Sequence, residues 1–371
     1  MTFSSKAGRK DVGKKTVGKK VLGFSLTLVV VILCFELAQP RIEAVDRQPP
    51  RNLPSQLEWV GAVRNAADVI GKESRFKWLM KKIVGLDDRQ RAMLAPYGIA
   101  VDSRGRMLVV DTRARLVHVF DPEHHKYRTF RAPDRDPFAS PIAIALDANG
   151  LIYVSDSIRS RIFVFNPEGK FLRTIGALGK NESIFKRSTG IAIDRQRQRL
   201  YVVDTVAMKV IVLTLDGQLI QRVGERGLEA GQFNFPTQIA VSPDGSFWVV
   251  DSLNFRVQHF DANFQVVNGF GRLGDSIGEF DKAKGIALDS RGNVYVVDGF
   301  RDRVQVYTPQ GRIRFYFGQT GPAEGQFFLP TGITIDEHDR IYVADSYNRR
   351  VQIFHLRPDA QLAEMPSRGG N

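Results

Sequence analysis

Six aspartates recur at a nearly constant spacing and form the most regular chemical pattern in this 371-residue chain. They are Asp111, Asp156, Asp204, Asp251, Asp298 and Asp345, with successive gaps of 45, 48, 47, 47 and 47 residues. A basic residue follows each one, at Arg115, Arg161, Lys209, Arg256, Arg303 and Arg350. Such pairs would suit a ring around a ligand, but Asp also caps turns and pairs with cations of its own hairpin. Because every repeat carries the pair, we interpret the six aspartates as structural repeat markers.

Four cations break the repeat pattern in the segment that leads into the first strand of a unit. Repeats four and six have the apolar forms NFPT and FLPT there, whereas repeat three has Lys186 and Arg187 and repeat five has Lys282 and Lys284. One interpretation is a basic patch that receives an acidic partner segment or an anionic glycan. The other is a set of loop cations that only face solvent.

A second candidate surface combines aromatic residues and arginines in the turns of repeats four to six. Its members are Phe255, Phe300, Arg301, Tyr347 and Arg349. Aromatic residues with arginine are typical anchors of protein interfaces, and similar sets bind RNA by stacking. We predict a protein-binding surface, because the export predicted below separates the chain from RNA.

Side chains that would support catalysis or metal binding are scattered. The histidines are His118, His124, His125, His259, His338 and His355, and Cys34 is the only cysteine. No GxSxG motif occurs, and no Ser or Cys has a His and a carboxylate at a recognisable spacing. One cysteine excludes an internal disulfide and a thiolate metal site. We therefore predict no catalytic residues, no metal ligands and no cofactor, and leave open whether a divalent ion occupies the central channel.

The elements that position these residues are short β-strands repeated six times. Residues 332–354 (GITIDEHDRIYVADSYNRRVQIF) have the pattern of three strands separated by two turns. In repeat five, we expect four strands at 285–289, 293–298, 303–307 and 312–318. A period in the 40s with several strands per period is typical of a β-propeller with one blade per repeat.

Two further patterns describe the interior of the expected propeller. A large apolar residue stands five positions before each first strand, at Met93, Phe138, Phe185, Phe233, Phe280 and Phe327. We predict that it fills the seam between neighbouring blades. The third-strand copies VQHF, VQVY and VQIF are more polar than the second strands, as expected further from the axis.

These motifs resemble the NHL repeat. The resemblance rests on YVADSYNRRVQIF, the strand GRIRFYFG, the GQF–P loop and the strand GIAVD, and it covers residues 98–356 in six copies. It implies a six-bladed propeller. The family includes RNA-binding domains, protein-binding domains and an amidating lyase with a metal site, so the resemblance does not determine the function. No set of histidines here matches the lyase site, and that activity is not carried over.

The first 56 residues predict export or membrane anchoring. Residues 1–20 form a basic cytoplasmic tail, residues 21–38 an apolar signal anchor or signal peptide, and residues 39–56 a proline-rich linker. Lysines before the apolar run place the remainder outside the membrane. We favour a single-pass anchor over cleavage, which would give a secreted protein. The tail supplies +6 of the net charge of +13, and residues 98–356 hold 33 Lys and Arg against 29 Asp and Glu. The charge therefore does not indicate a nucleic-acid surface.

Closure of the ring needs a strand from outside the repeats. The sixth repeat has three strands, and residues 357–371 form a polar tail. An open ring would leave an unpaired sheet edge. Within residues 57–97, the segment 57–63 (LEWVGAV) has a strand pattern and residues 74–84 an amphipathic helix pattern. We predict an all-β, six-bladed propeller in which strand 57–63 pairs outside the third strand of repeat six and the short helix covers the seam.

The predicted function is non-catalytic binding, as a scaffold on the outer side of a cell membrane. The partner is a protein or a polysaccharide, held on the face that carries the turns after the second strands, and no nucleic acid is expected. The alternative is a propeller enzyme, a lyase or hydrolase with or without a metal, whose site lies at the channel mouth. The partner's identity and the oligomeric state stay open.

Overall fold

A computed structural model describes residues 53–70, 92–177 and 183–357 of the chain. Several predicted segments lie outside these ranges: the basic tail 1–20, the apolar run 21–38, most of the linker, the helix 74–84, and all but the first residue of the tail 357–371. Within the described ranges, no helix is long and apolar enough to cross a membrane.

Six four-stranded antiparallel sheets, the blades, make up almost all of the described chain. Blade 1 contains β2 (Pro96–Val101), β3 (Met107–Asp111), β4 (Leu116–Asp121) and β5 (Lys126–Phe130), and blade 2 contains β6 (Pro141–Leu146), β7 (Ile152–Asp156), β8 (Arg161–Phe165) and β9 (Phe171–Ile175). Blade 3 contains β10 (Ser188–Asp194), β11 (Arg199–Asp204), β12 (Lys209–Thr214) and β13 (Leu219–Val223). Blade 4 contains β14 (Pro236–Val241), β15 (Phe247–Asp251), β16 (Arg256–Phe260) and β17 (Val266–Phe270), with the 3-10 turn η2 (Ser252–Asn254) after β15.

The last two blades follow the same plan. Blade 5 contains β18 (Ala283–Leu288), β19 (Val294–Asp298), β20 (Arg303–Tyr307) and β21 (Ile313–Phe317). Blade 6 contains β22 (Pro330–Ile335), β23 (Arg340–Asp345), β24 (Arg350–Leu356) and, from the other end of the chain, β1 (Leu57–Val63). The strands expected for repeat five are therefore confirmed to within two residues.

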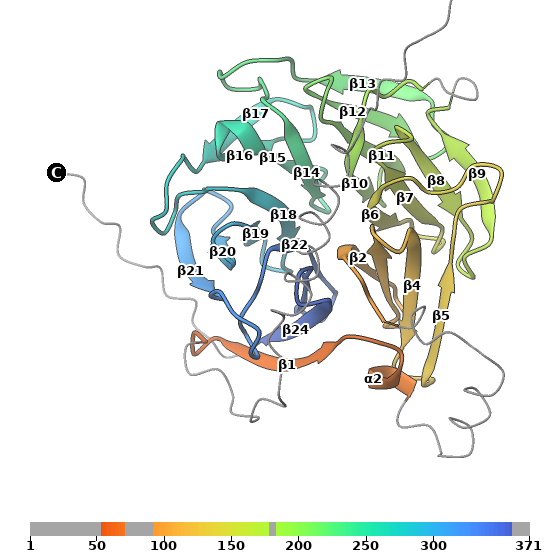
Figure 1. Cartoon of the computed structure of the whole chain (residues 1–371). Coiled ribbons are helices and arrows are strands. Elements are labelled where there is room, and N and C mark those ends of the chain that lie inside the picture. The colour runs from red at the N-terminus through yellow and green to blue at the C-terminus, as the bar shows by residue number, and fades with distance from the viewer. Residues whose placement is uncertain (1–52, 71–91, 178–182, 358–371) are drawn as a thin grey trace, which may run out of the picture. The chain divides into compact units, whose positions relative to one another are not determined.

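The blades form a closed propeller ring, as the repeat predicted. Each first strand contacts the first strand of the next blade, and β22 of blade 6 contacts β2 of blade 1. Figure 1 shows the first strands nearest the axis and the fourth strands at the rim. We call the face where second strands end and first strands begin the top face.

Strand β1 closes the ring and confirms the predicted spare strand with the same bounds. It pairs antiparallel with β24, from Leu57 opposite Leu356 to Val63 opposite Val351, and runs along the outside of blade 6 (Figure 1). The Trp59 indole Nε1 donates a hydrogen bond to Gln352 Oε1 at 3.1 Å. A one-turn helix that the sequence pattern did not predict, α2 (Ala67–Ile70), follows.

Apolar clusters fill the seams between neighbouring blades. The six predicted plug residues are all buried there, with exposed fractions of 0–3%: Met93, Phe138, Phe185, Phe233, Phe280 and Phe327. Phe327, for example, belongs to the cluster formed by residues of blades 5 and 6, together with Leu57 of β1. Their predicted role in the seams is confirmed.

A β-bulge interrupts each blade where its first strand begins. In blade 5, Ala283 pairs with Asp298 and Ile286 with Val296, so Lys284 and Gly285 lie opposite Val297 alone. The other five blades have a register shift at the same point. Bulges redirect side chains out of the sheet pattern. The side chains redirected here, at the top end of the first strands, belong to Tyr97, Ile142, Thr189, Thr237, Lys284 and Thr331.

Candidate functional site

The repeat aspartates hold the loops of the top face together from below. Their side chains are 0–1% exposed. Each accepts hydrogen bonds from one or two backbone amides of the loop that enters its own blade. Asp204, for instance, accepts from the amides of Lys186 and Arg187 at 2.8 and 2.9 Å. These carboxylates lie inside the fold, where they fix the loops that carry the candidate site.

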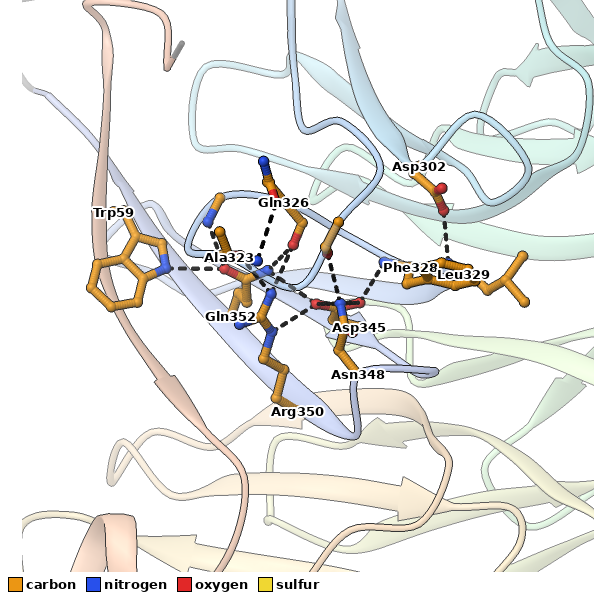
Figure 2. Close-up of polar contacts among 12 residues, drawn as sticks. Trp59, Asp302, Ala323, Gln326, Phe328, Leu329, Asp345, Asn348, Arg350 and Gln352 are labelled. Carbon is orange, nitrogen blue, oxygen red and sulfur yellow. Dashed lines mark hydrogen bonds and ion pairs between the residues drawn. The ribbon is translucent and has the colours of Figure 1, made fainter. Parts of the chain in front are cut away.

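Blade 6 shows the most extensive version of this support (Figure 2). Asp345 accepts from the Phe328 amide at 2.8 Å and pairs with Arg350 Nε at 2.7 Å. Arg350 Nη2 also donates to the carbonyls of Ala323 and Gln326, at 2.7 and 2.9 Å. The next amide, that of Leu329, donates to Asp302 of blade 5 at 2.7 Å, which ties the two blades together (Figure 2).

The predicted basic residues lie on the top face but in separate places. Lys186 and Arg187 are exposed in the loop before β10, and Lys282 is half-buried in the loop before β18. Burial raises the pKa of the Tyr97 phenol, and the positive charge of Arg187 acts against that rise.

Lys284 occupies the bulge of β18, beside a glycine. In blade 3, Thr205 follows the repeat aspartate and donates its hydroxyl to the carbonyl of Pro236 in the next blade at 2.7 Å. Blade 5 has Gly299 at this position, where a β-carbon would lie 2.8 Å from Lys284 Cδ and 2.9 Å from Pro330 O. The Lys284 side chain thus fills the space that a hydroxyl side chain takes elsewhere. Burial lowers the pKa of Lys284, the charge of Lys282 acts the same way, and Asp302 opposes both.

The aromatic residues predicted as one group take two different positions. Phe300 and Tyr347 are each the second residue after the repeat aspartate and are 58% and 66% exposed. Phe255 is the fourth residue after Asp251 and has left-handed backbone with φ 55°. The residue of blade 4 that matches Phe300 and Tyr347 is Leu253.

Phe300, Tyr347 and the arginines beside them make few contacts with their surroundings. Arg301 Nη2 pairs with Asp281 Oδ2 at 3.1 Å, and the Lys284 Nζ lies 5.9 Å from the centre of the Phe300 ring. Tyr347 stacks on Phe328 with ring centres 4.6 Å apart. Arg349, like Phe255, has a left-handed backbone, with φ 53°, and its side chain is exposed.

Exposed apolar side chains recur in the turns after the second strands, on the top face, and the sequence interpretation missed them. The second residue after the aspartate is large, apolar and exposed in five blades: Ile158 (69%), Val206 (44%), Leu253 (38%), Phe300 (58%) and Tyr347 (66%). Blade 1 has Arg113 instead. We call these five residues the apolar collar. Aligning the repeats on the aspartate, rather than looking for aromatics alone, would have revealed it.

A cavity of about 570 Å³ occupies the central channel below this level. Its walls are the first strands, from the glycines Gly98, Gly285 and Gly332 down to the turns at Asp102 and Asp336 on the opposite face. None of the predicted site residues lines it. The candidate surface and the cavity are therefore separate features of the propeller.

The histidines do not assemble into a site. His118 is buried, with Nδ1 2.8 Å from Tyr127 Oη and Nε2 3.3 Å from Asp111 Oδ2. His259 stacks on Trp248 with ring centres 3.9 Å apart. Among the residues that the structure describes, no three His, Cys, Asp or Glu side chains group as metal ligands would.

Comparisons with known proteins agree with the fold. Residues 137–291 match a family model described as a 6-bladed beta-propeller, and residues 329–354 match the NHL repeat. No curated protein matches the sequence.

Similar solved structures have diverse functions. They include a virginiamycin B lyase from Staphylococcus aureus (14% identity, 71% of this chain, 95% of that chain, TM-score 0.53). A gluconolactonase from Xanthomonas campestris gives 14% identity over 71% of this chain and 86% of that chain, with TM-score 0.53. An auxiliary nutrient binding protein from Bacteroides thetaiotaomicron gives 13% identity over 71% of this chain and 69% of that chain, with TM-score 0.56. At these identities the likeness shows the fold alone.

Proposed function

Because the chain is a six-bladed β-propeller with an NHL repeat, we propose that it is a binding module whose top face holds a protein partner. The apolar collar carries this proposal. Five blades present a large apolar side chain to solvent at the same turn position, whereas the aspartates beneath are buried. Exposed large apolar side chains repeated around one face of a rigid scaffold are typical of interaction sites.

The composition of the collar favours protein over polysaccharide. Ile158, Val206 and Leu253 are aliphatic and suit apolar side chains, while sugar hydroxyls have no partner on them. Phe300 and Tyr347 are the kind of aromatic anchor that contributes most to protein interfaces. Lys186, Arg187, Lys282 and Arg349 lie around the collar and would complement an acidic partner.

The enzyme alternative predicted from the sequence gains no specific support from the similar lyase and gluconolactonase, because at 14% identity that likeness concerns the fold. We therefore retain binding as the proposal. We also propose that the propeller acts outside a membrane, on the evidence of the basic tail followed by the apolar run 21–38.

Site-specific photo-crosslinking in cells tests the binding proposal. A photoreactive residue replaces Ile158 on the collar or, as the control, Leu219 on the rim strand β13, which is 46% exposed. We expect a discrete crosslinked protein from position 158 and none from position 219. Equal products from both positions would contradict a top-face site.

Affinity for the captured protein gives the quantitative test. We expect Ile158→Ser, Phe300→Ser and Tyr347→Ser together to weaken binding by about 100-fold or more, at about 1–2 kcal/mol per anchor. The matched control changes three exposed rim residues, Leu172→Ser, Leu219→Ser and Val267→Ser. Thermal melting of both variants verifies that the fold is retained.

A further inference from the structure

Blade 5 departs from its neighbours at three adjoining positions of the top face. Its bulge carries Lys284 where blades 3, 4 and 6 carry threonine. Gly299 replaces the serine or threonine that follows the aspartate in the other five blades. Asp302 stands at the left-handed turn position, with φ 50°. The three changes fit together, because the glycine makes room for the lysine stem and Asp302 supports the adjoining loop.

The Lys284 ammonium has no anionic partner in the part of the chain that the structure describes. Two carboxylates in the neighbouring loop and turn, Asp281 and Asp302, already make other contacts. Asp302 accepts from the Leu329 amide and from the Thr320 hydroxyl, both at 2.7 Å. Asp281 pairs with Arg301 at 3.1 Å. A half-buried cation is therefore held beside Phe300 without an ion pair, and the charge of Asp302 offsets only part of the effect of burial and of Lys282.

We propose that the Lys284 ammonium anchors a carboxylate of an acidic, partly apolar peptide segment, with the Phe300 ring packing against the neighbouring apolar side chain. This inference rests on the proposed protein-binding function and names the chemistry of the partner. The binding segment contains an Asp or Glu adjacent to a large apolar residue.

Charge and desolvation favour a carboxylate at this point. A partly desolvated ammonium gains most from an opposite charge, because a low local dielectric strengthens the attraction. Burial and Lys282 already lower the pKa of Lys284, and a bound carboxylate would reverse that effect. The exposed Phe300 and the rest of the collar complement apolar side chains, which favours peptide over glycan.

Selection from a random peptide library displayed on phage tests the inference directly, because it requires no identified partner. Selection uses the full propeller, with Lys284→Met as the test variant, because methionine keeps an unbranched stem beside Gly299 and removes the charge. Lys170→Met, an exposed lysine in the turn after β8 on the opposite face, is the charge-matched control. Each selected peptide is synthesised together with a twin in which Asp or Glu is replaced by Asn or Gln.

The expected result is a coupling between Lys284 and the peptide carboxylate. The amide twin should bind the wild type and the Lys170→Met control about tenfold more weakly than the acidic peptide. On Lys284→Met the two peptides should bind alike. NMR of the reductively ¹³C-methylated protein should show the pKa of Lys284 rising with the acidic peptide and not with the twin.

Three outcomes would overturn the inference, and they separate it from the proposed function. Selected peptides without an acidic residue, or with no coupling to Lys284, would refute the inference and leave the binding function standing. If the wild type enriches no peptide beyond the collar triple variant, both the function and the inference fail. Binding of digalacturonate through Lys284 in place of any peptide would reject the peptide in favour of an anionic glycan.

Discussion

Blades 4 to 6 hold their entering loops with a pair of third-strand side chains that blades 1 to 3 lack. The pair is an arginine and a glutamine two residues apart: Arg256 and Gln258, Arg303 and Gln305, and Arg350 and Gln352. In all three blades both side chains donate to backbone carbonyls of the loop. The glutamine Oε1 accepts from a loop glycine amide, at Gly231, Gly278 and Gly325.

Blades 1 to 3 satisfy the same positions in other ways. His118 takes the glutamine position of blade 1 and contacts Asp111 and Tyr127. Phe163 and Ile211 take it in blades 2 and 3 and join the apolar seams. These blades also contact each other on the opposite face, where Arg128 donates to Pro167 O at 3.0 Å and Arg173 to Leu215 O at 2.8 Å. The glutamine position of the third strand therefore accepts either a polar side chain or an apolar one, provided that the loop carbonyls have other hydrogen-bond donors.

Removing the buried third-strand arginine of blade 6 should give the largest change in stability. Arg350 is 1% exposed and pairs with Asp345, which is 0% exposed. We expect Arg350→Met to lower the free energy of unfolding by about 3–5 kcal/mol, because a buried carboxylate and two carbonyls lose their donor. Lys209→Met, at the equivalent position of blade 3, should change it by less than about 0.5 kcal/mol. Urea unfolding of both variants measures the difference. Equal losses of stability would show that the buried arginine of blade 6 contributes no more than the lysine at the equivalent position of blade 3.

The closing strand gives a smaller effect within the same network. Trp59→Phe removes the hydrogen bond to Gln352, whose Oε1 still accepts from the Gly325 amide at 2.9 Å. We expect a loss of about 1 kcal/mol in the free energy of unfolding. Tyr316→Phe, on the rim strand of blade 5, is 40% exposed and should leave stability unchanged. A double-mutant cycle with Gln352→Met would isolate the pair, and zero coupling would contradict its role in closure.

The smallest expected effect is a pH dependence of stability that comes from Asp111 of blade 1. It is measured by comparing the wild type with the Asp111→Asn variant. Burial alone would raise the pKa of Asp111, but hydrogen bonds from His118 and from the amides of Ala114 and Leu94 hold it below its ordinary value of 3.8. A lowered folded-state pKa adds stability that is fully present above pH 3.8 and is lost as the pH falls below it. The stability difference between wild type and Asp111→Asn, from unfolding curves at several pH values, should therefore shrink below pH 3.8. A difference that does not vary with pH would show that the carboxylate keeps an ordinary pKa.

The fold was predictable because its determinants repeat. The aspartate spacing, the six plug residues and the spare strand 57–63 all depend on patterns that recur or on a missing partner, and each is visible in the sequence. The buried glutamines were not recognised. VQHF, VQVY and VQIF suggested strands further from the axis, whereas Gln258, Gln305 and Gln352 are 0–2% exposed. A polar residue can be buried when loop carbonyls surround it, and those carbonyls come from a distant part of the chain.

The candidate site was less predictable because it depends on turn geometry. Phe255 is the fourth residue after its repeat aspartate, whereas Phe300 and Tyr347 are the second. The fourth residue of each of these turns has a left-handed backbone, so its side chain takes a different position from that of the second residue. The exposure of Ile158, Val206 and Leu253 follows from the same geometry, although aliphatic residues ordinarily suggest core. Whether Lys186, Arg187, Lys282 and Lys284 contact a partner stays a prediction.

The closing strand also determines when the ring can form. Trp59 and Gln352 are 293 positions apart. At a synthesis rate of about 5–20 residues per second, the first strand would wait roughly 15–60 seconds on the ribosome for its partner. During that interval blades 1 to 5 can assemble one after another while the edge of β1 stays unpaired. The first of the described strands to be synthesised is then the last to be paired, and a chain that stops short of β24 leaves two open edges at once.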